Sequence, residues 1–182
     1  MKVGLTSGCF DLFHHSHLLF LERCRSMCDK LIVGVDSDEL VRATKGPGRP
    51  IHDEMHRFSL VNSLSVVSVA FVLRSLEDLD KIAADFDVDE LYKCEVWKDR
   101  AAKGERVYGA NPEHVRIVHV GGRPAFQPSI QHMRPRLVIV PDVPGMVSTT
   151  KIIERIRSGM LPVPTTEPVD NSSTGMCEAA GR

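Results

Sequence analysis

The sequence has few aromatic residues, no excess of charge of one sign and no long apolar run. Aromatic residues make up 5% of the 182 residues, and 23 Lys and Arg side chains balance 24 Asp and Glu side chains, for a formal net charge of −1. A protein without a strongly basic surface does not collect nucleic acid or anionic membranes through charge alone. No apolar run approaches the roughly 20 residues that cross a bilayer. The composition therefore disfavours nucleic acid and membranes as partners.

The five cysteines do not form the pattern of a disulfide framework. Their number is odd, their spacing is irregular, and the first residues lack a secretory signal pattern. Cys24 and Cys28 are four residues apart and would share a helix face, but no second Cys or His pair follows at zinc-finger spacing. We therefore expect buried, reduced thiols in a soluble cytoplasmic protein.

Strand-like and helix-like segments alternate along the chain. Leu31–Val35 is apolar without polar alternation, which is typical of a strand that is covered on both faces. The expected strands are 3–6, 31–35, 66–73, 90–93, 115–120 and 136–140. The expected helices are 16–28, 37–42, 53–64, 75–86 and 148–158. This alternation predicts an α/β fold: a doubly wound, Rossmann-like parallel sheet of about five strands with helices on both faces.

The composition divides the chain in two. Residues 1–158 carry the alternating pattern and are expected to form one domain, within which 101–134 shows no motif. Residues 159–182 contain mostly Pro, Ser, Thr and small residues, which cannot bury enough apolar surface to become ordered. We therefore expect a disordered tail at 159–182.

The loop after the first strand carries the clearest chemical pattern, Gly-Cys-Phe-Asp-Leu-Phe-His-His-Ser-His from Gly8 to His17. His14 and His17 are three residues apart at a helix start, so one turn aligns them on one face. Unpaired N–H groups and the positive end of the helix dipole attract anions there, and imidazoles add directed donors. A nucleoside triphosphate fits this chemistry. Alternatively, one histidine caps the helix and the other packs in the core.

Two further segments should meet this loop, because ligands bind beyond the carboxyl ends of parallel strands. Lys45–Pro50 is rich in Gly and Pro and carries Lys45 and Arg49, with Arg57 on the next helix; these cations suit phosphorylated ligands, although the segment could be a solvated surface loop. Ser148–Thr150 places hydroxyls at a helix start, where they donate to phosphate or act as a plain cap.

In this order, the motifs resemble the cytidylyltransferase-like nucleotidyltransferases over residues 1–158. Residues 8–11, 31–38, 45–46 and 49–51 look most like heptose-1-phosphate adenylyltransferases, the ADP-heptose synthases. Residues 10–14 and 148–152 look equally like glycerol-3-phosphate and choline-phosphate cytidylyltransferases. Two departures stand out. Ser16 replaces the glycine between the two histidines, and 142–147 lacks the Arg and Glu that precede Ser-Thr-Thr in cytidylyltransferases, which favours ATP over CTP.

The resemblance implies a role for each matching residue. His14, His17 and Lys45 would be catalytic, and Arg49 and Arg57 would bind the acceptor. The implied nucleotide-binding residues are Gly8, Cys9, Phe10, Asp11, Lys93, Ser148, Thr149 and Thr150. Lys93 matches a Lys-Gly-Gly-Asp-Tyr-like segment near the base, with Cys94 in place of a glycine. Mg²⁺ would arrive with the triphosphate rather than occupy a resident metal site, and a homodimer is expected.

The implied reaction is attack by the phosphate of a phosphorylated sugar or similar small molecule on the α-phosphorus of an NTP, with release of pyrophosphate. The nucleophile is already ionised at pH 7, so positioning and charge stabilisation suffice. The alternatives are a CTP-dependent cytidylyltransferase and a nucleotide-binding protein without turnover. A metal-dependent hydrolase or metal-binding protein is a further alternative, using His14, His15 and His17 with His52 or His56.

Overall fold

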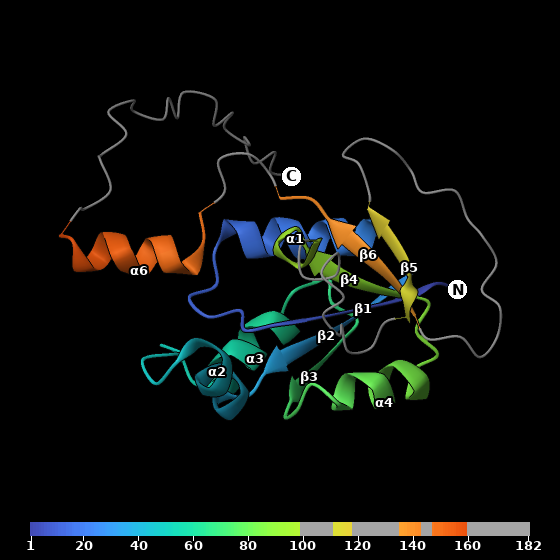
Figure 1. Ribbon diagram of the computed structural model, residues 1–182, viewed down its shortest axis with the longest axis horizontal. Helices are drawn as coiled ribbons and strands as arrows, with labels where there is room; N and C mark the ends of the chain where they lie inside the picture. The colour runs from blue at the N-terminus through green and yellow to red at the C-terminus, as the bar shows by residue number, and fades with distance from the viewer. Residues whose placement is uncertain (99–110, 118–134, 143–146, 160–182) are drawn as a thin grey trace, which may run out of the picture. The chain divides into compact units, whose positions relative to one another are not determined.

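A computed structural model describes residues 1–98, 111–117, 135–142 and 147–159 (Figure 1). The chain divides into two compact units, Met1–Thr149 and Thr150–Arg182. The first unit contains the sheet. Helix α6 (Thr149–Arg157) begins at the last residue of the first unit, and the rest of it belongs to the second. The expected tail lies outside the described residues apart from Gly159, and the boundary at 158 stays a prediction.

Six parallel strands form one sheet in the order β3-β2-β1-β4-β6-β5. The strands are β1 (Val3–Gly8), β2 (Lys30–Asp36), β3 (Val69–Leu73), β4 (Glu90–Cys94), β5 (Asn111–Ile117) and β6 (Arg136–Val140). The chain moves outward from β1 to β3 and then returns to the other side of β1, so β1 and β4 flank the switch point at which such sheets bind ligands. The predicted Rossmann-like α/β fold is confirmed.

Helices cover both faces of the sheet (Figure 1). The helices of the first unit are α1 (His15–Ser26), α2 (Asp38–Lys45), α3 (Glu54–Asn62) and α4 (Asp78–Asp85). One apolar cluster joins Leu21 of α1 and Val61 of α3 to the sheet, and a second cluster joins Leu79 of α4 to the opposite face. Because the sheet is buried on both faces, the sequences of its strands are continuous apolar runs.

Helix α2 corrects one expectation from the sequence. Ser37 caps its start, because the Ser37 side chain accepts a hydrogen bond from the Leu40 N–H. The helix continues three residues past the predicted end at Arg42 and stops at Gly46, whose φ of 91° ends the helical path. Lys45 is therefore the last helical residue and not part of a loop, so the rigid helix limits its range of movement.

The described part of the chain also shows the state of four cysteines. Cys9, Cys24, Cys28 and Cys94 form no disulfide, and the first three are buried, as expected. Burial raises the pKa of the Cys24 thiol, which makes it an unreactive core group. Within the same described residues, no helix is long and apolar enough to cross a membrane.

Strand β1 packs closely against its neighbours at Gly4. A Cβ atom at this position would lie 2.3 Å from Cε2 of Tyr92 and 2.9 Å from Sγ of Cys28. Gly48, by contrast, has nothing within 4 Å of an added Cβ. Of these two glycines, Gly4 therefore lacks the space for a side chain and Gly48 has it.

We predict that Gly4→Ala destabilises the protein by about 1–3 kcal/mol, because a methyl group added to a filled core forces its neighbours to move. Urea unfolding measures the effect, and Gly48→Ala is the control, with an expected change within about 0.5 kcal/mol. Equal stability of the two variants would contradict the packing at β1.

Candidate active site

The turn between β1 and α1 has an unusual backbone. Phe10 and Leu12 adopt positive φ angles, 50° and 44°, although neither is glycine. Such conformations persist only where surrounding contacts enforce them, and they concentrate at functional sites. Cys9, Phe10 and Asp11 are all buried, and they supply those contacts. The predicted nucleotide-binding residues Gly8, Cys9 and Phe10 therefore lie in a turn whose shape is fixed by burial.

Asp11 anchors this turn to the segment that follows α2. Its carboxylate accepts hydrogen bonds from the backbone N–H groups of Ile51 and His52, at 2.9 and 3.0 Å. Arg49 donates to it through Nε at 2.9 Å and forms an ion pair with it. Burial alone would raise the pKa of Asp11, but the two N–H groups and the Arg49 guanidinium lower it below its ordinary value. Asp11 and Arg49, predicted to bind nucleotide and acceptor, thus bind each other.

Arg57 has a structural role that differs from the predicted one. Its side chain is 2% exposed. The guanidinium donates to the carbonyl oxygens of His52 and Cys9, at 2.9 and 2.6 Å, and forms a 2.7 Å ion pair with Asp38. Because the group is enclosed and paired, the prediction that Arg57 binds the acceptor is revised. It joins the β1–α1 turn to α2.

His14 and His17 come together at the start of α1. Their rings stack with centroids 3.9 Å apart, and the backbone N–H of His14 donates to Nδ1 of the His17 ring at 3.3 Å. Since Nδ1 of His17 accepts, the proton of the neutral ring lies on Nε2. Burial, with the neighbouring charges of His14 and Lys45, lowers the pKa of His17 to about 3, and burial also lowers the pKa of His14. Both rings are therefore neutral at pH 7, and each offers one N–H donor.

The segment before α6 reaches the same place in the first unit. The Thr149 hydroxyl donates to the carbonyl oxygen of Asp11 at 3.0 Å, and its Oγ1 lies 3.4 Å from Nε2 of His14. Ser16 donates to the carbonyl oxygen of Val147 at 2.9 Å, so the side chain that replaces glycine in the motif holds this segment. Ser148, next to Thr149, is exposed. Thr150 belongs to the second unit, which is described by itself.

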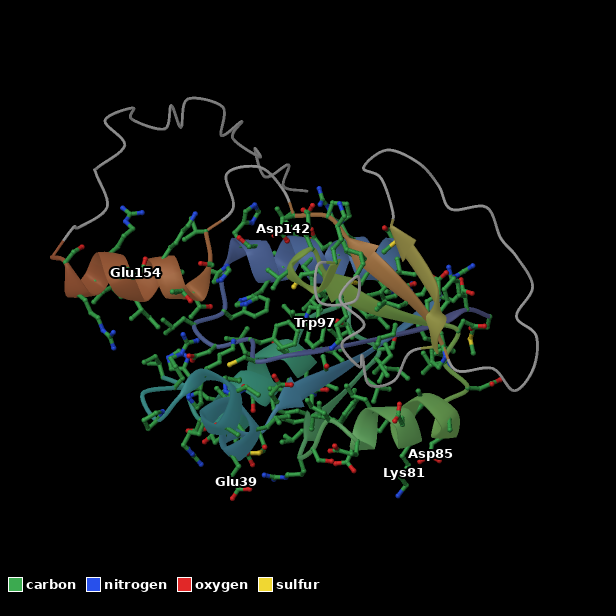
Figure 2. The ribbon with its side chains drawn as sticks, in the orientation of Figure 1. Glu39, Lys81, Asp85, Trp97, Asp142 and Glu154 are labelled. Atoms are coloured by element: carbon green, nitrogen blue, oxygen red, sulfur yellow. The ribbon has the colours of Figure 1, made fainter. Side chains whose placement is uncertain are left out.

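Two lysines carry positive charge at the carboxyl end of the sheet. Lys45 is exposed at the end of α2, and its charge lowers the pKa values of Cys9 and His17, which places it near both. Lys93 is 5% exposed on β4, where Nζ donates to Oγ of Ser7 at 2.8 Å and lies 5.0 Å from the ring centroid of Trp97. Figure 2 labels Trp97 among the side chains packed on the sheet.

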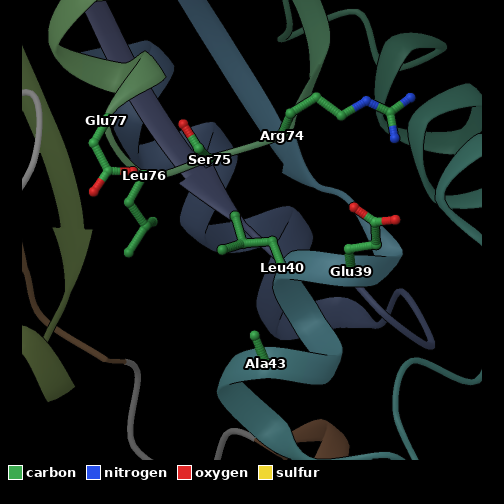
Figure 3. A pocket seen from close by; sticks show the side chains of 7 residues that line it. All are labelled: Glu39, Leu40, Ala43, Arg74, Ser75, Leu76 and Glu77. Atoms are coloured by element: carbon green, nitrogen blue, oxygen red, sulfur yellow. The ribbon is translucent and has the colours of Figure 1, made fainter.

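Sequence reasoning missed Asp36, the last residue of β2. Its carboxylate is half-buried and lies within electrostatic range of Lys93 and Lys45. The signal was available, because a carboxylate directly after an apolar strand lies at the edge where ligands bind. Nearby, a pocket of about 300 Å³ opens between α2 and the segment after β3 (Figure 3). It is lined by Glu39, Leu40, Ala43, Arg74, Ser75, Leu76 and Glu77, none of which was a predicted site residue.

The charges at this edge have a simple balance. Arg49 neutralises Asp11 and Arg57 neutralises Asp38, and Lys45, exposed at the end of α2, presents its charge to solvent. In the described ranges, no group of three or more His, Cys, Asp or Glu side chains could hold a metal ion. The arrangement combines neutral N–H donors, a helix N-terminus and cations, which is the chemistry of phosphate binding.

Comparison with known protein families matches residues 5–155 to the family described as cytidylyltransferase-like. The chain belongs to this family. Membership confirms the resemblance predicted from the motifs.

Individual relatives agree with this assignment. The chain is 36% identical to the bifunctional protein HldE of Hyphomonas neptunium over 159 residues, covering 87% of this chain and 28% of the relative. It is 34% identical to HldE of Desulfatibacillum aliphaticivorans, covering 87% and 27%. The chain thus spans little more than a quarter of these curated relatives. A lipopolysaccharide core biosynthesis protein from Thermoplasma volcanium shares the fold, with a TM-score of 0.51 and 20% identity over 79% of this chain and 98% of that one.

The role of Asp11 as an anchor predicts that Asp11→Asn costs about 2–4 kcal/mol of stability at pH 7, because Arg49 loses its buried counter-charge. The folded-state pKa of Asp11 is lowered, so its contribution is fully present above about pH 4, the unfolded-state value, and is lost as the pH falls further through the lower folded-state pKa. Urea unfolding should therefore show a smaller difference between variant and wild type at acid pH. A difference independent of pH would contradict the ion pair.

The histidine geometry predicts that His17 remains neutral, with its proton on Nε2, from about pH 5 to pH 8. Long-range ¹H–¹⁵N correlation spectra distinguish the two tautomers and the charged ring, and His15, which is exposed at the start of α1, serves as the solvent-accessible comparison. Titration of His17 with a midpoint above pH 6, or a proton on Nδ1, would contradict the hydrogen bond from His14.

Proposed function

We propose that this protein transfers a nucleoside monophosphate from an NTP, with ATP favoured, to the phosphate of a sugar or similar small molecule, and releases pyrophosphate. The observation that carries the proposal is the stacked pair of His14 and His17, with His17 Nε2–H as a donor beside the N-terminus of α1. The preference for ATP rests on the resemblance of residues 8–11, 31–38, 45–46 and 49–51 to heptose-1-phosphate adenylyltransferases, and on the missing Arg and Glu before Ser148. The expected homodimer and cytoplasmic location stay part of this proposal.

The chemistry requires no general base. An oxygen of the acceptor phosphate attacks the α-phosphorus in line, and the bond from that phosphorus to the oxygen bridging to the β-phosphorus breaks. The bonding electrons leave with pyrophosphate. Because the acceptor phosphate is already ionised at pH 7, the protein needs only to align the two reactants and to stabilise the developing charge.

The residues of the site divide this work. Backbone N–H groups of the β1–α1 turn and of the first turn of α1 bind phosphate oxygens. His17 donates from Nε2 to an oxygen of the α-phosphate as charge develops there, and His14 helps to hold the triphosphate beside it. Lys45 attracts the phosphate of the acceptor. Mg²⁺ enters as part of the MgNTP substrate and neutralises charge on the leaving pyrophosphate.

Pyrophosphate release tests the proposal directly. ATP, CTP, GTP and UTP are each supplied with Mg²⁺ against a panel of sugar, glycerol and choline phosphates. Turnover with ATP and a sugar phosphate supports the proposal, whereas CTP with a glycerol or choline phosphate supports a cytidylyltransferase. Thermal stabilisation by an NTP without turnover identifies a non-catalytic nucleotide-binding protein, and stabilisation by none of them overturns the nucleotide site.

We predict that His17→Ala lowers kcat by at least about 10²-fold, the scale for loss of a preorganised donor to the transition state. His15→Ala is the matched control, because His15 lies on the same helix turn but is exposed. Its kcat should stay within about twofold of wild type. An unchanged kcat in His17→Ala would remove His17 from the mechanism.

A further inference from the structure

The carboxylate of Asp36 has no role in the proposed phosphate chemistry. It follows the apolar strand β2 directly and is half-buried at the carboxyl end of the sheet. Among the residues that the structure describes, no donor forms a hydrogen bond or ion pair with this carboxylate, whereas Asp11 and Asp38 are both paired with arginine. A partly buried carboxylate without a hydrogen-bond partner accepts strongly from any donor group that reaches it.

The strand register places Asp36 on the same face of the sheet as Ser7 and Lys93. Ser7 pairs with Gly34 across β1 and β2, and the Lys93 ammonium donates to Ser7 from β4. Side chains two residues apart on a strand share a face, so Asp36 follows Gly34 on that side. The same face carries Leu5, Ile32 and Leu79 in its apolar cluster, so it is the α4 side of the sheet.

The triphosphate belongs to the opposite side. Helix α1, which starts with the histidine pair, packs through Leu21 and Cys24 on the other apolar cluster, together with Phe10 of the turn. The β1–α1 turn therefore separates two regions of the carboxyl edge. A triphosphate on the α1 side, with the base of the NTP toward Lys93 on β4, would leave the Asp36 end of this face to the second reactant, with the reacting phosphorus between the two reactants.

The charges around Asp36 select the kind of group it can bind. Burial raises the pKa of Asp36, and the nearby charges of Lys93, Lys45 and Arg57 lower it. The two lysines disfavour an ammonium group on the ligand, since Arg57 is paired with Asp38, and the Asp36 carboxylate disfavours a phosphate group beside it. Uncharged hydroxyl groups are repelled neither by the cations nor by the carboxylate, and they donate hydrogen bonds readily to a carboxylate.

Trp97 supports the same selection. Aromatic faces bind quaternary ammonium groups, but the Lys93 ammonium already lies 5.0 Å from the centroid of this ring. A second cation at that face would meet the lysine charge. The side of the sheet that carries Asp36 is thus poorly suited to a choline-like acceptor.

We propose that Asp36 is a specificity-determining residue that accepts hydrogen bonds from the hydroxyl groups of a polyhydroxylated acceptor phosphate, a sugar or polyol phosphate rather than an amino-alcohol phosphate. This inference rests on the proposed function, which it deepens by naming the acceptor class. Lys45 attracts the phosphate of that acceptor, and Asp36 binds its hydroxyl-bearing carbon chain.

The test compares Asp36→Asn and Asp36→Ala with wild type. The isosteric Asn keeps the volume but not the charge, and Asp85→Asn, an exposed carboxylate on α4 (Figure 2), is the control. KM for sugar and polyol phosphates should rise roughly 10- to 100-fold in Asp36→Ala and less in Asp36→Asn, the scale for a lost hydrogen bond to a charged group. KM for ethanolamine phosphate and the Kd for the NTP should change less than threefold, as should every value in Asp85→Asn.

Separate readouts distinguish failure of the inference from failure of the proposed function. If wild type turns over and the ratio of kcat/KM between sugar and ethanolamine phosphates is unchanged in both Asp36 variants, the inference is overturned while the function stands. If wild type releases no pyrophosphate, the inference is still tested by calorimetric titration of the same acceptors into the NTP-bound protein. Sugar phosphate binding that Asp36→Ala abolishes supports the inference, and binding of no polyhydroxylated phosphate by wild type overturns it.

Discussion

Two ion pairs at the carboxyl end of the sheet, each with one fully buried partner, hold the rest of the site in place. Asp11 binds Arg49, and Arg57 binds Asp38, so residues far apart in sequence are joined across the β1–α1 turn. A buried charge that loses its partner is costly, so neither segment can move alone. This constraint maintains the positive φ angles at Phe10 and Leu12, and with them the direction in which α1 begins.

The consequence for catalysis is a site that relies on directed donors more than on charge. The arginines neutralise the carboxylates beside them, and burial keeps both histidines neutral. A neutral imidazole with a fixed tautomer offers one N–H in one direction. This donor does not have to reorient when charge develops on a phosphate. Lys45, by contrast, is exposed at the end of α2, where it can attract an anionic ligand from solvent.

The sequence predicted the fold well because apolar strands and Gly- and Pro-containing turns are local signals. Each of the six strands overlaps a segment expected to be a strand, although the predicted sheet had about five strands and β5 begins at Asn111 instead of 115. The contacts of Arg49 and Arg57 could not be predicted from local sequence. A cation that binds substrate and a cation that binds a buried carboxylate occur in the same local sequence pattern. Only the contact of Arg49 with Asp11, 38 residues earlier, distinguishes them.

Arg57 orients the backbone of the β1–α1 turn even though its guanidinium is enclosed. Its guanidinium holds the carbonyl oxygen of Cys9 at 2.6 Å, on the interior side of the turn. In a trans peptide the C=O and the following N–H point in opposite directions, so this bond turns the Phe10 N–H away from Arg57. An N–H that faces the ligand side can donate to a phosphate oxygen, and the carbonyl that would repel the same phosphate is satisfied inside the protein. The buried arginine thus orients the backbone of the anion site without touching the anion.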